Sequence, residues 1–186
     1  MLSLIGGATR PGKTTLTQRL FRERRTPYFV LDYFVSALTY GAPELGVHHD
    51  QPDIERATRL WPRLRPMLEN ILEVEPAYVI EGDTLLPGNV ADLMAAYPGE
   101  IRICFLGYPE IAPEEKFRNI RERGGGVNDW LRDASDAYVH ELVGTGIAFS
   151  RHLQAECARH ALPFFDTSQD FAAGVEAAYA WLTRSD

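Results

Sequence analysis

The sequence predicts an α/β fold in which an open, five-stranded parallel sheet carries helices on both faces. Short apolar segments alternate with longer helical segments, and the apolar segments lack the strict polar–apolar alternation of half-exposed strands. Strands separated by helices are typical of parallel sheets, because each parallel pair needs a crossover connection. With 186 residues the chain has the length of one domain, 1–186, and can bury a substantial core.

The expected strands are brief, mainly apolar and rich in β-branched or aromatic side chains. They are Leu2–Ile5, Tyr28–Leu31, Tyr78–Ile80, Ile101–Leu106 and Pro163–Phe165. The segments between them are expected to form helices at Lys13–Arg25, Asp53–Val74, Val90–Ala96, Pro113–Arg123, Asp129–His160 and Asp170–Arg184. Right-handed crossovers should connect the strands.

Two of the expected helices contain residues that disfavour a helix. Pro62 and Pro66 lie inside Asp53–Val74 and predict a break or kink, because proline lacks a backbone N–H. The glycines of Gly144–Gly146 are expected to interrupt the helical region Asp129–His160.

Composition and charge disfavour several classes of protein. Apolar residues make up 45% of the chain and charged residues 24%, as in an ordinary globular protein. The formal net charge of −7 disfavours a polyanion, so we expect no nucleic-acid partner. The N-terminus lacks the basic region of a signal peptide, and no stretch reaches the ~20 apolar residues of a membrane span. We therefore expect a cytoplasmic protein without membrane association.

A phosphate-binding loop follows the first expected strand. The residues Gly7-Ala8-Thr9-Arg10-Pro11-Gly12-Lys13-Thr14 satisfy the pattern G-x-x-x-x-G-K-[ST], and a helix is expected after them. Glycines let the backbone N–H groups surround a phosphate, and the helix N-terminus adds its positive dipole end. Lys13 is expected to reach the β- and γ-phosphates of ATP and Thr14 to bind Mg²⁺, with Thr15 completing the nucleotide-binding set. Arg10 is open between a phosphate contact and a surface ion pair.

Other parts of the sequence narrow the class of P-loop protein. The tetrapeptide N-K-x-D, which reads guanine in small GTPases, is absent. The chain also has neither the length nor the signature of an ABC-type transporter ATPase. A kinase is therefore favoured over a switch protein or a transporter.

Carboxylates follow the second and third expected strands, at the sheet edge where open α/β folds bind ligands. Asp32 can take a proton from an attacking hydroxyl or hold Mg²⁺ through water, or it can cap a helix. Glu81 has the Walker B position and is expected to orient a water on Mg²⁺. Gly82 would let the acceptor approach the backbone, and Asp83 would bind the acceptor or form a turn.

A basic helix and a run of glycines predict a lid over residues 118–132. Arg118, Arg121 and Arg123 precede Gly124–Gly126, and Arg132 follows it. A hinged lid can bring arginines onto a phosphoryl group during transfer, so these arginines are candidate catalytic or substrate-binding residues. Pairing with acidic neighbours on the helix surface is the alternative.

Two further segments carry polar side chains. Asp166-Thr167-Ser168 follows the fifth expected strand and is predicted to contact adenine, although a turn that caps the last helix is equally consistent. His48-His49-Asp50 lies in an expected loop and has no clear third metal ligand, so we expect a loop near the acceptor rather than a metal site.

These residues resemble the adenylate-kinase-like branch of P-loop small-molecule kinases, which includes shikimate kinase, chloramphenicol phosphotransferase and the zeta-toxin-type kinases. Gly7–Thr14 looks like their phosphate loop, Asp32 like their carboxylate after the second strand, and Glu81-Gly82 like their acid–glycine pair. Arg118–Asn128 is similar to their lid and Phe165–Ser168 to their adenine-facing loop. The resemblance covers most of the chain.

The resemblance implies the sheet order 2-3-1-4-5, with residues 33–75 binding the acceptor. It also implies transfer of phosphate from ATP, with Mg²⁺, to a small molecule by a monomer or homodimer. Glu81-Gly82-Asp83 lacks the Phe-Pro-Arg that follows this glycine in nucleoside-monophosphate kinases, so a hydroxyl compound is the expected acceptor. The alternatives are a non-catalytic ATP-sensing module and a nucleotide or polynucleotide kinase.

Overall fold

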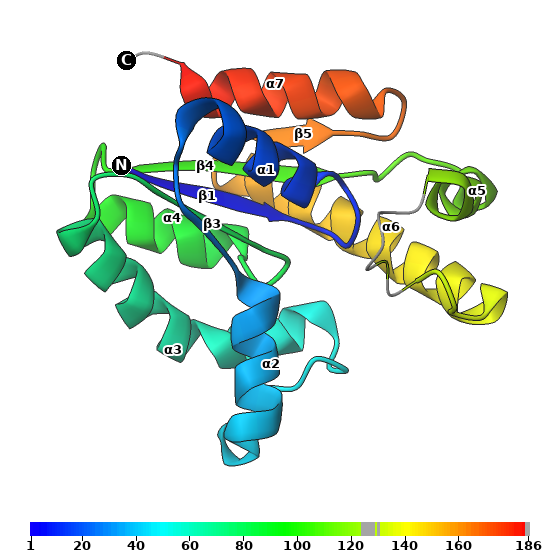
Figure 1. Cartoon of the computed structure of the whole chain (residues 1–186), viewed down its shortest axis with the longest axis horizontal. Coiled ribbons are helices and arrows are strands. Elements are labelled where there is room, and N and C mark those ends of the chain that lie inside the picture. Colours follow the sequence, from blue (N-terminus) through cyan, green and yellow to red (C-terminus); the bar gives the residue numbers. More distant parts are fainter. Residues whose placement is uncertain (124–128, 130, 185–186) are drawn as a thin grey trace.

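The computed structural model describes residues 1–123, 129 and 131–184. Within them, a parallel sheet of five strands has the order β2-β3-β1-β4-β5, which confirms the predicted fold class (Figure 1). The strands are β1 (Leu2–Gly7), β2 (Tyr28–Val30), β3 (Tyr78–Gly82), β4 (Ile101–Gly107) and β5 (Phe164–Asp166).

Helices cover both faces of this sheet. They are α1 (Lys13–Arg24), α2 (Leu31–Gly41), α3 (Asp53–Val74), α4 (Pro87–Ala96), α5 (Pro113–Arg123), α6 (Asp136–Arg159) and α7 (Phe171–Thr183), and a 3-10 turn, η1, spans Pro43–Leu45. Figure 1 shows α1 and α7 on one face of the sheet and α3, α4 and α6 on the other. In the described part of the chain, no helix is long and apolar enough to span a bilayer.

Each face of the sheet has its own hydrophobic core, because neighbouring side chains of a strand point to opposite faces. Leu4 of β1 and Ile103 of β4 belong to the larger core with residues of α2, α3, α4 and α6. Ile5 and Cys104, the next residues along, pack with residues of α1 and α7. Burial on both faces explains why these strands read as continuous apolar runs.

Of the break or kink predicted at the prolines of α3, the break is wrong, and the kink stays a prediction. The helix runs without interruption through Pro62 and Pro66. Both prolines lie on its exposed side, so water can reach the carbonyls that lose a donor, while Leu60, Leu64 and Leu68 are buried. Burial of that apolar face outweighs the two missing hydrogen bonds.

The predicted interruption at Gly144–Gly146 is also wrong, because α6 continues through it. Gly146 serves close packing instead: a Cβ atom there would overlap the hydroxyl of Tyr108. The same helix begins at Asp136 rather than at Asp129, and the Ser135 hydroxyl caps it by accepting from the Tyr138 N–H at 3.3 Å. Helix α2 was not expected, since the sequence pattern extended the second strand through Leu31.

Candidate active site

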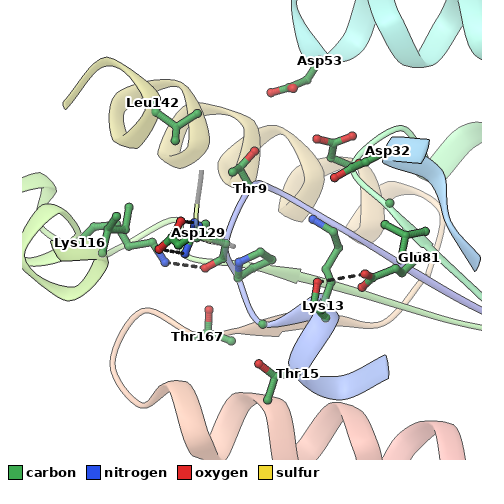
Figure 2. A pocket seen from close by; sticks show the side chains of 18 of the residues that line it. Thr9, Lys13, Thr15, Asp32, Asp53, Glu81, Lys116, Asp129, Leu142 and Thr167 are labelled. Atoms are coloured by element: carbon green, nitrogen blue, oxygen red, sulfur yellow. Dashed lines mark hydrogen bonds and ion pairs between the residues drawn. The ribbon is translucent and has the colours of Figure 1, made fainter. Parts of the chain in front are cut away.

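A pocket of about 1330 Å³ lies where the carboxyl ends of the strands meet the loops that follow them. Its walls come from the phosphate loop, α2, the start of α3, the loop after β3, α5 and the loop after β5. This is the edge of an open α/β sheet where ligands bind. Figure 2 shows Lys13, Asp32 and Glu81 gathered around one part of the pocket.

The phosphate loop lies between β1 and α1 and wraps tightly. Gly7 and Gly12 have φ angles of 145° and 109°, which are unfavourable for residues with a side chain. A Cβ atom on Gly7 would also overlap the Leu106 carbonyl oxygen. The Lys13 ammonium donates to the Gly7 and Ala8 carbonyl oxygens at 3.1 and 2.6 Å, so its charge lies at the loop itself.

Glu81 joins the end of β3 to the first turns of α1. Its side chain is only 1% exposed, and its two oxygens accept from the Thr14 and Thr17 hydroxyls at 3.0 and 3.2 Å. Burial raises the pKa of Glu81, while Lys13 and the two hydroxyls act in the opposite direction. A hydroxyl and a carboxylate thus lie together beside the phosphate loop, and oxygen ligands of this kind suit Mg²⁺. Thr17 was not predicted.

Tyr108 and Lys116 support the phosphate loop from its outer side. The Tyr108 hydroxyl donates to the Thr9 carbonyl oxygen at 2.7 Å, and the Lys116 ammonium donates to the Arg10 carbonyl oxygen at 2.8 Å. That ammonium also lies 3.7 Å from the centre of the Tyr108 ring. Burial lowers the pKa of Lys116 to about 8, and the charges of Arg10 and Lys13 add to the effect. Neither Tyr108 nor Lys116 was predicted.

Arg10, left open by the sequence, pairs with Asp129. Two guanidinium nitrogens donate to the two carboxylate oxygens, and the Asp129 side chain is 4% exposed. Paired forks of this kind are the stronger form of ion pair. Arg10 therefore connects the phosphate loop to the segment that follows α5.

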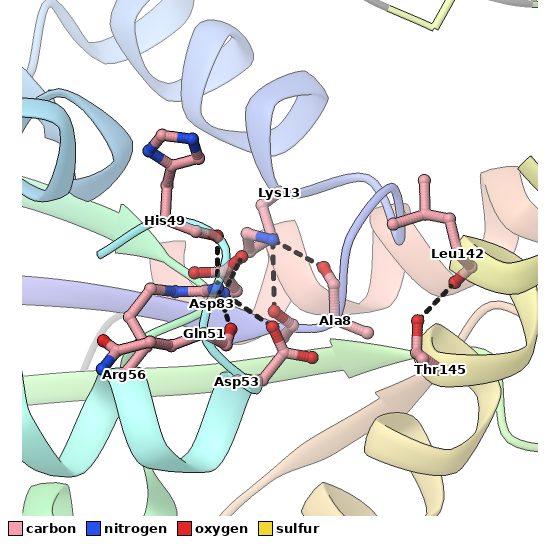
Figure 3. Close-up of polar contacts among 10 residues, drawn as sticks. Ala8, Lys13, His49, Gln51, Asp53, Arg56, Asp83, Leu142 and Thr145 are labelled. Atoms are coloured by element: carbon pink, nitrogen blue, oxygen red, sulfur yellow. Dashed lines mark hydrogen bonds and ion pairs between the residues drawn. The ribbon is translucent and has the colours of Figure 1, made fainter. Parts of the chain in front are cut away.

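Arg56 of α3 organises the opposite end of the pocket. One terminal nitrogen donates to the His49 and Gln51 carbonyl oxygens at 3.0 and 2.9 Å. The other donates to the carboxylates of Asp53 and Asp83 at 2.6 and 3.2 Å (Figure 3). The guanidinium is nearly buried, so these contacts fix the 49–53 segment against the loop after β3. Arg56 and Asp53 were not predicted.

Asp32 lies in the first turn of α2 and faces the same space. Figure 2 shows the Lys13 side chain directed toward it. Among the residues that the structure describes, its carboxylate makes no hydrogen bond or ion pair. Desolvation by the pocket walls and the charge of Asp83 raise the pKa of Asp32, and Lys13 and Arg56 oppose them. A carboxylate of raised pKa therefore lies beside the phosphate loop.

The structure places most of the predicted binding residues in this pocket. It is lined by Thr9, Arg10, Pro11, Gly12, Lys13, Thr14, Thr15, Asp32, Glu81, Gly82, Asp83, Thr167 and Ser168. Gly7 and Ala8 form the base of the loop. Asp166 does not line the pocket: its carboxylate accepts from the Ser168 N–H at 2.7 Å, and so it shapes the turn whose next two residues do.

The predicted lid arginines do not line the pocket where the structure describes them. Arg118 and Arg132 are exposed. Arg121 donates to the Leu131 and Ala134 carbonyl oxygens and pairs with Asp136, which ties α5 to the start of α6. The Arg123 side chain and the Gly124–Gly126 hinge lie outside the described residues. Their roles in phosphate binding stay predictions.

The His48-His49-Asp50 segment contributes to the pocket through His49. Over the described ranges, no three or more histidine, cysteine, aspartate or glutamate side chains are grouped to hold a metal ion. His49 instead lies near the Tyr40 ring, with ring centres 5.6 Å apart.

Comparison with known proteins identifies the fold. No protein-family model matches the chain, and no curated protein is detectably similar to it in sequence. Solved structures do resemble it: a shikimate kinase from Bacteroides thetaiotaomicron has a TM-score of 0.57 at 17% identity, with 99% of each chain covered. A gluconokinase from Sinorhizobium meliloti 1021 has a TM-score of 0.58 at 18% identity, covering 98% of this chain and 91% of that one.

The chain has the fold of P-loop small-molecule kinases. A sugar kinase from a Janibacter species resembles it to the same degree, with a TM-score of 0.58 at 19% identity over 97% of this chain and 93% of that one. At identities this low, the structural likeness establishes the fold alone, so the acceptor has to be inferred from the pocket itself.

Proposed function

We propose that this protein is an ATP-dependent phosphotransferase that transfers the γ-phosphoryl group to a hydroxyl of a small molecule. The observation that carries the proposal is the meeting, in one pocket, of a phosphate loop with the Asp32 carboxylate, which has no hydrogen-bond or ion-pair partner among the described residues. Lys13 and Thr14 occupy the phosphate end of that pocket, and Asp32 lies across from them. Binding a nucleotide alone does not require a base there.

The phosphate end fits a nucleoside triphosphate. Phosphate oxygens would replace the Gly7 and Ala8 carbonyls as partners of the Lys13 ammonium, and the N–H groups of the loop and of the α1 N-terminus would surround them. Thr14 and Glu81 would hold Mg²⁺, which would neutralise charge on the β- and γ-phosphates. The turn at Thr167 and Ser168 would lie against the adenine ring of the nucleotide.

The reaction needs one proton acceptor, and Asp32 would serve. As the acceptor oxygen attacks the γ-phosphorus, Asp32 takes the hydroxyl proton, a new oxygen–phosphorus bond forms, and the bond from that phosphorus to the β–γ bridging oxygen breaks. ADP leaves with that oxygen. ATP and an alcohol thus give ADP, a phosphate ester and one proton, which Asp32 later releases to water.

Release of ADP from ATP and Mg²⁺ in the presence of a panel of hydroxyl compounds tests this proposal. We expect acceptor-dependent ADP release in the wild type and its loss in Lys13→Ala. Calorimetry should show ATP binding by the wild type. ATP binding without transfer to any acceptor would favour a sensing module, and transfer to the end of an oligonucleotide would favour a polynucleotide kinase.

A further inference from the structure

The end of the pocket formed by Asp32, Asp53, Arg56 and Asp83, here called the acceptor end, contains one guanidinium group whose terminal nitrogens already donate hydrogen bonds to the protein. Of the five N–H groups of Arg56, the four on its terminal nitrogens donate to the His49 and Gln51 carbonyls and to the Asp53 and Asp83 carboxylates. An acceptor carboxylate or phosphate is best bound by a free guanidinium fork. The terminal nitrogens of Arg56 cannot bind such a ligand in this way, because two backbone carbonyls and two carboxylates of the protein already accept their hydrogen bonds.

Negative charge predominates on this wall of the pocket. The carboxylates of Asp32, Asp53 and Asp83 line it, and Arg56 is the guanidinium that faces them. In the part of the chain that the structure describes, three carboxylates against one guanidinium leave two formal negative charges on this wall. Among the described residues, the other pocket cations lie at the phosphate end: Lys13 on the phosphate loop, and Arg10 and Lys116 beside it. A bound triphosphate would offset those cations and leave the excess at the acceptor end.

The mouth of this region also carries an aromatic ring suited to a cation. Tyr40 lines the pocket while its side chain is 75% exposed, and His49 lies beside it with ring centres 5.6 Å apart. The face of an aromatic ring attracts an ammonium group. Tyr40 thus extends a surface that attracts positive charge.

We propose that the acceptor is an alcohol that carries a protonated amine, bound with its ammonium group among Asp32, Asp53, Asp83 and Tyr40. This inference rests on the proposed kinase activity and specifies the substrate class of the same pocket. The hydroxyl is presented to Asp32 and the γ-phosphate, and the ammonium group stays protonated throughout transfer. A sugar acid or another anionic acceptor is disfavoured because it meets a wall whose described residues carry a net negative charge.

The pKa values agree with this distribution of charge. Desolvation first, and then the Asp83 carboxylate, raise the pKa of both Asp32 and Asp53, although Arg56 and Lys13 act in the opposite direction. The attraction of Arg56 and Lys13 is thus smaller than the combined effect of desolvation and Asp83 on these two carboxyl groups. A ligand ammonium group would supply the missing positive charge.

Sets of acceptors that share a skeleton and differ in charge test the proposal. One set is glucosamine, glucose and gluconate, and another is serinol, glycerol and glycerate. For each compound, kcat/KM is obtained from ADP release, and thermal stabilisation is measured with a non-hydrolysable ATP analogue. We expect the amine of at least one set to exceed its neutral partner by about tenfold or more, and the carboxylate to be poorest, with the preference falling as salt rises.

Charge-removing variants locate the effect. Asp53→Asn should reduce the preference for the amine over its neutral partner about tenfold. Asp50→Asn removes an exposed charge nearby that does not line the pocket, and it should leave the preference unchanged. Thermal unfolding of both variants shows whether they remain folded.

The outcomes separate this inference from the proposed function. A carboxylate preference, or equal responses within every set (including no response at all), overturns the inference. If gluconate or glycerate is phosphorylated best, the kinase activity stands and the substrate class is wrong. If ATP fails to bind to the wild type, the proposed function itself is wrong.

Discussion

The phosphate end and the acceptor end of the pocket are built in opposite ways. At the phosphate end, Lys13 and Thr14 belong to one continuous motif, which Glu81 joins from 67 positions away and which Tyr108 and Lys116 support from outside. At the acceptor end, Asp32 and Arg56 come from separate helices, and Asp83 comes from the loop after β3. A local motif specifies the first end, and tertiary packing specifies the second.

The two ends also differ in what their cations contact. Lys13 and Lys116 donate to backbone carbonyls, which are neutral and which a phosphate oxygen can replace with a gain in electrostatic energy. Arg56 donates to two carboxylates, and another anion could displace them only by leaving them unpaired. The phosphate end is thus ready for an anion, and the acceptor end is not.

The largest expected effect is at the phosphate end. Lys13→Ala should lower kcat/KM by about 10³-fold and weaken ATP binding, because it removes a preorganised cation from the transferring group. Steady-state ADP release and ATP calorimetry measure the two quantities. Arg24→Ala, an exposed position on the same helix, is the control and should behave as wild type. Equal behaviour of the two variants would show that the loop does not bind the triphosphate.

A substitution at the acceptor end should slow phosphoryl transfer without weakening ATP binding. Asp32→Asn should lower kcat by about 10²-fold, since it removes a positioned proton acceptor, and ATP affinity should stay close to that of the wild type. The exposed Asp92→Asn on α4 controls for loss of a carboxylate. Unchanged turnover in Asp32→Asn would remove the proposed base.

The phosphate end could be predicted from the sequence because the residues that form it are neighbours in the chain. The motif at Gly7–Thr14, the strand before it and the helix after it are read from neighbouring residues. The sheet order, which the resemblance implied, was also confirmed. Apolar runs buried on both faces gave the strands to within a few residues. Glu81 was accessible to the same reasoning, since it ends an apolar strand.

The acceptor end depends on partners that are distant in sequence. Arg56 and Asp83, which pair at this end, are 27 positions apart in the sequence. In a linear pattern Arg56 is one of several arginines of α3, and its burial alone distinguishes it. The short strand β2 gave too little signal to show where α2 begins.

A pH profile can test the coupling between carboxylates at the acceptor end. Asp32 must be ionised to accept a proton, so activity should fall as the pH drops through its raised pKa. Asp83→Asn removes a like charge and leaves more of the Arg56 charge to act on Asp32. The acid limb of kcat/KM should therefore move to lower pH. It should not move in Asp50→Asn, and a shift to higher pH in Asp83→Asn would contradict the assignment of Asp32.

The smallest expected effect concerns the outer support of the phosphate loop. Tyr108→Phe keeps the ring beneath Lys116 and removes only the hydrogen bond to the Thr9 carbonyl, so it should lower the free energy of unfolding by about 1 kcal/mol. ATP affinity should fall a few-fold, because the loop backbone is less firmly held. Urea unfolding and ATP calorimetry give the two numbers, with Tyr33→Phe at a 70% exposed position as the control. A loss of stability without a loss of ATP affinity would mean that the loop adopts its phosphate-binding form without help from Tyr108, and that the local motif alone suffices at this end of the pocket.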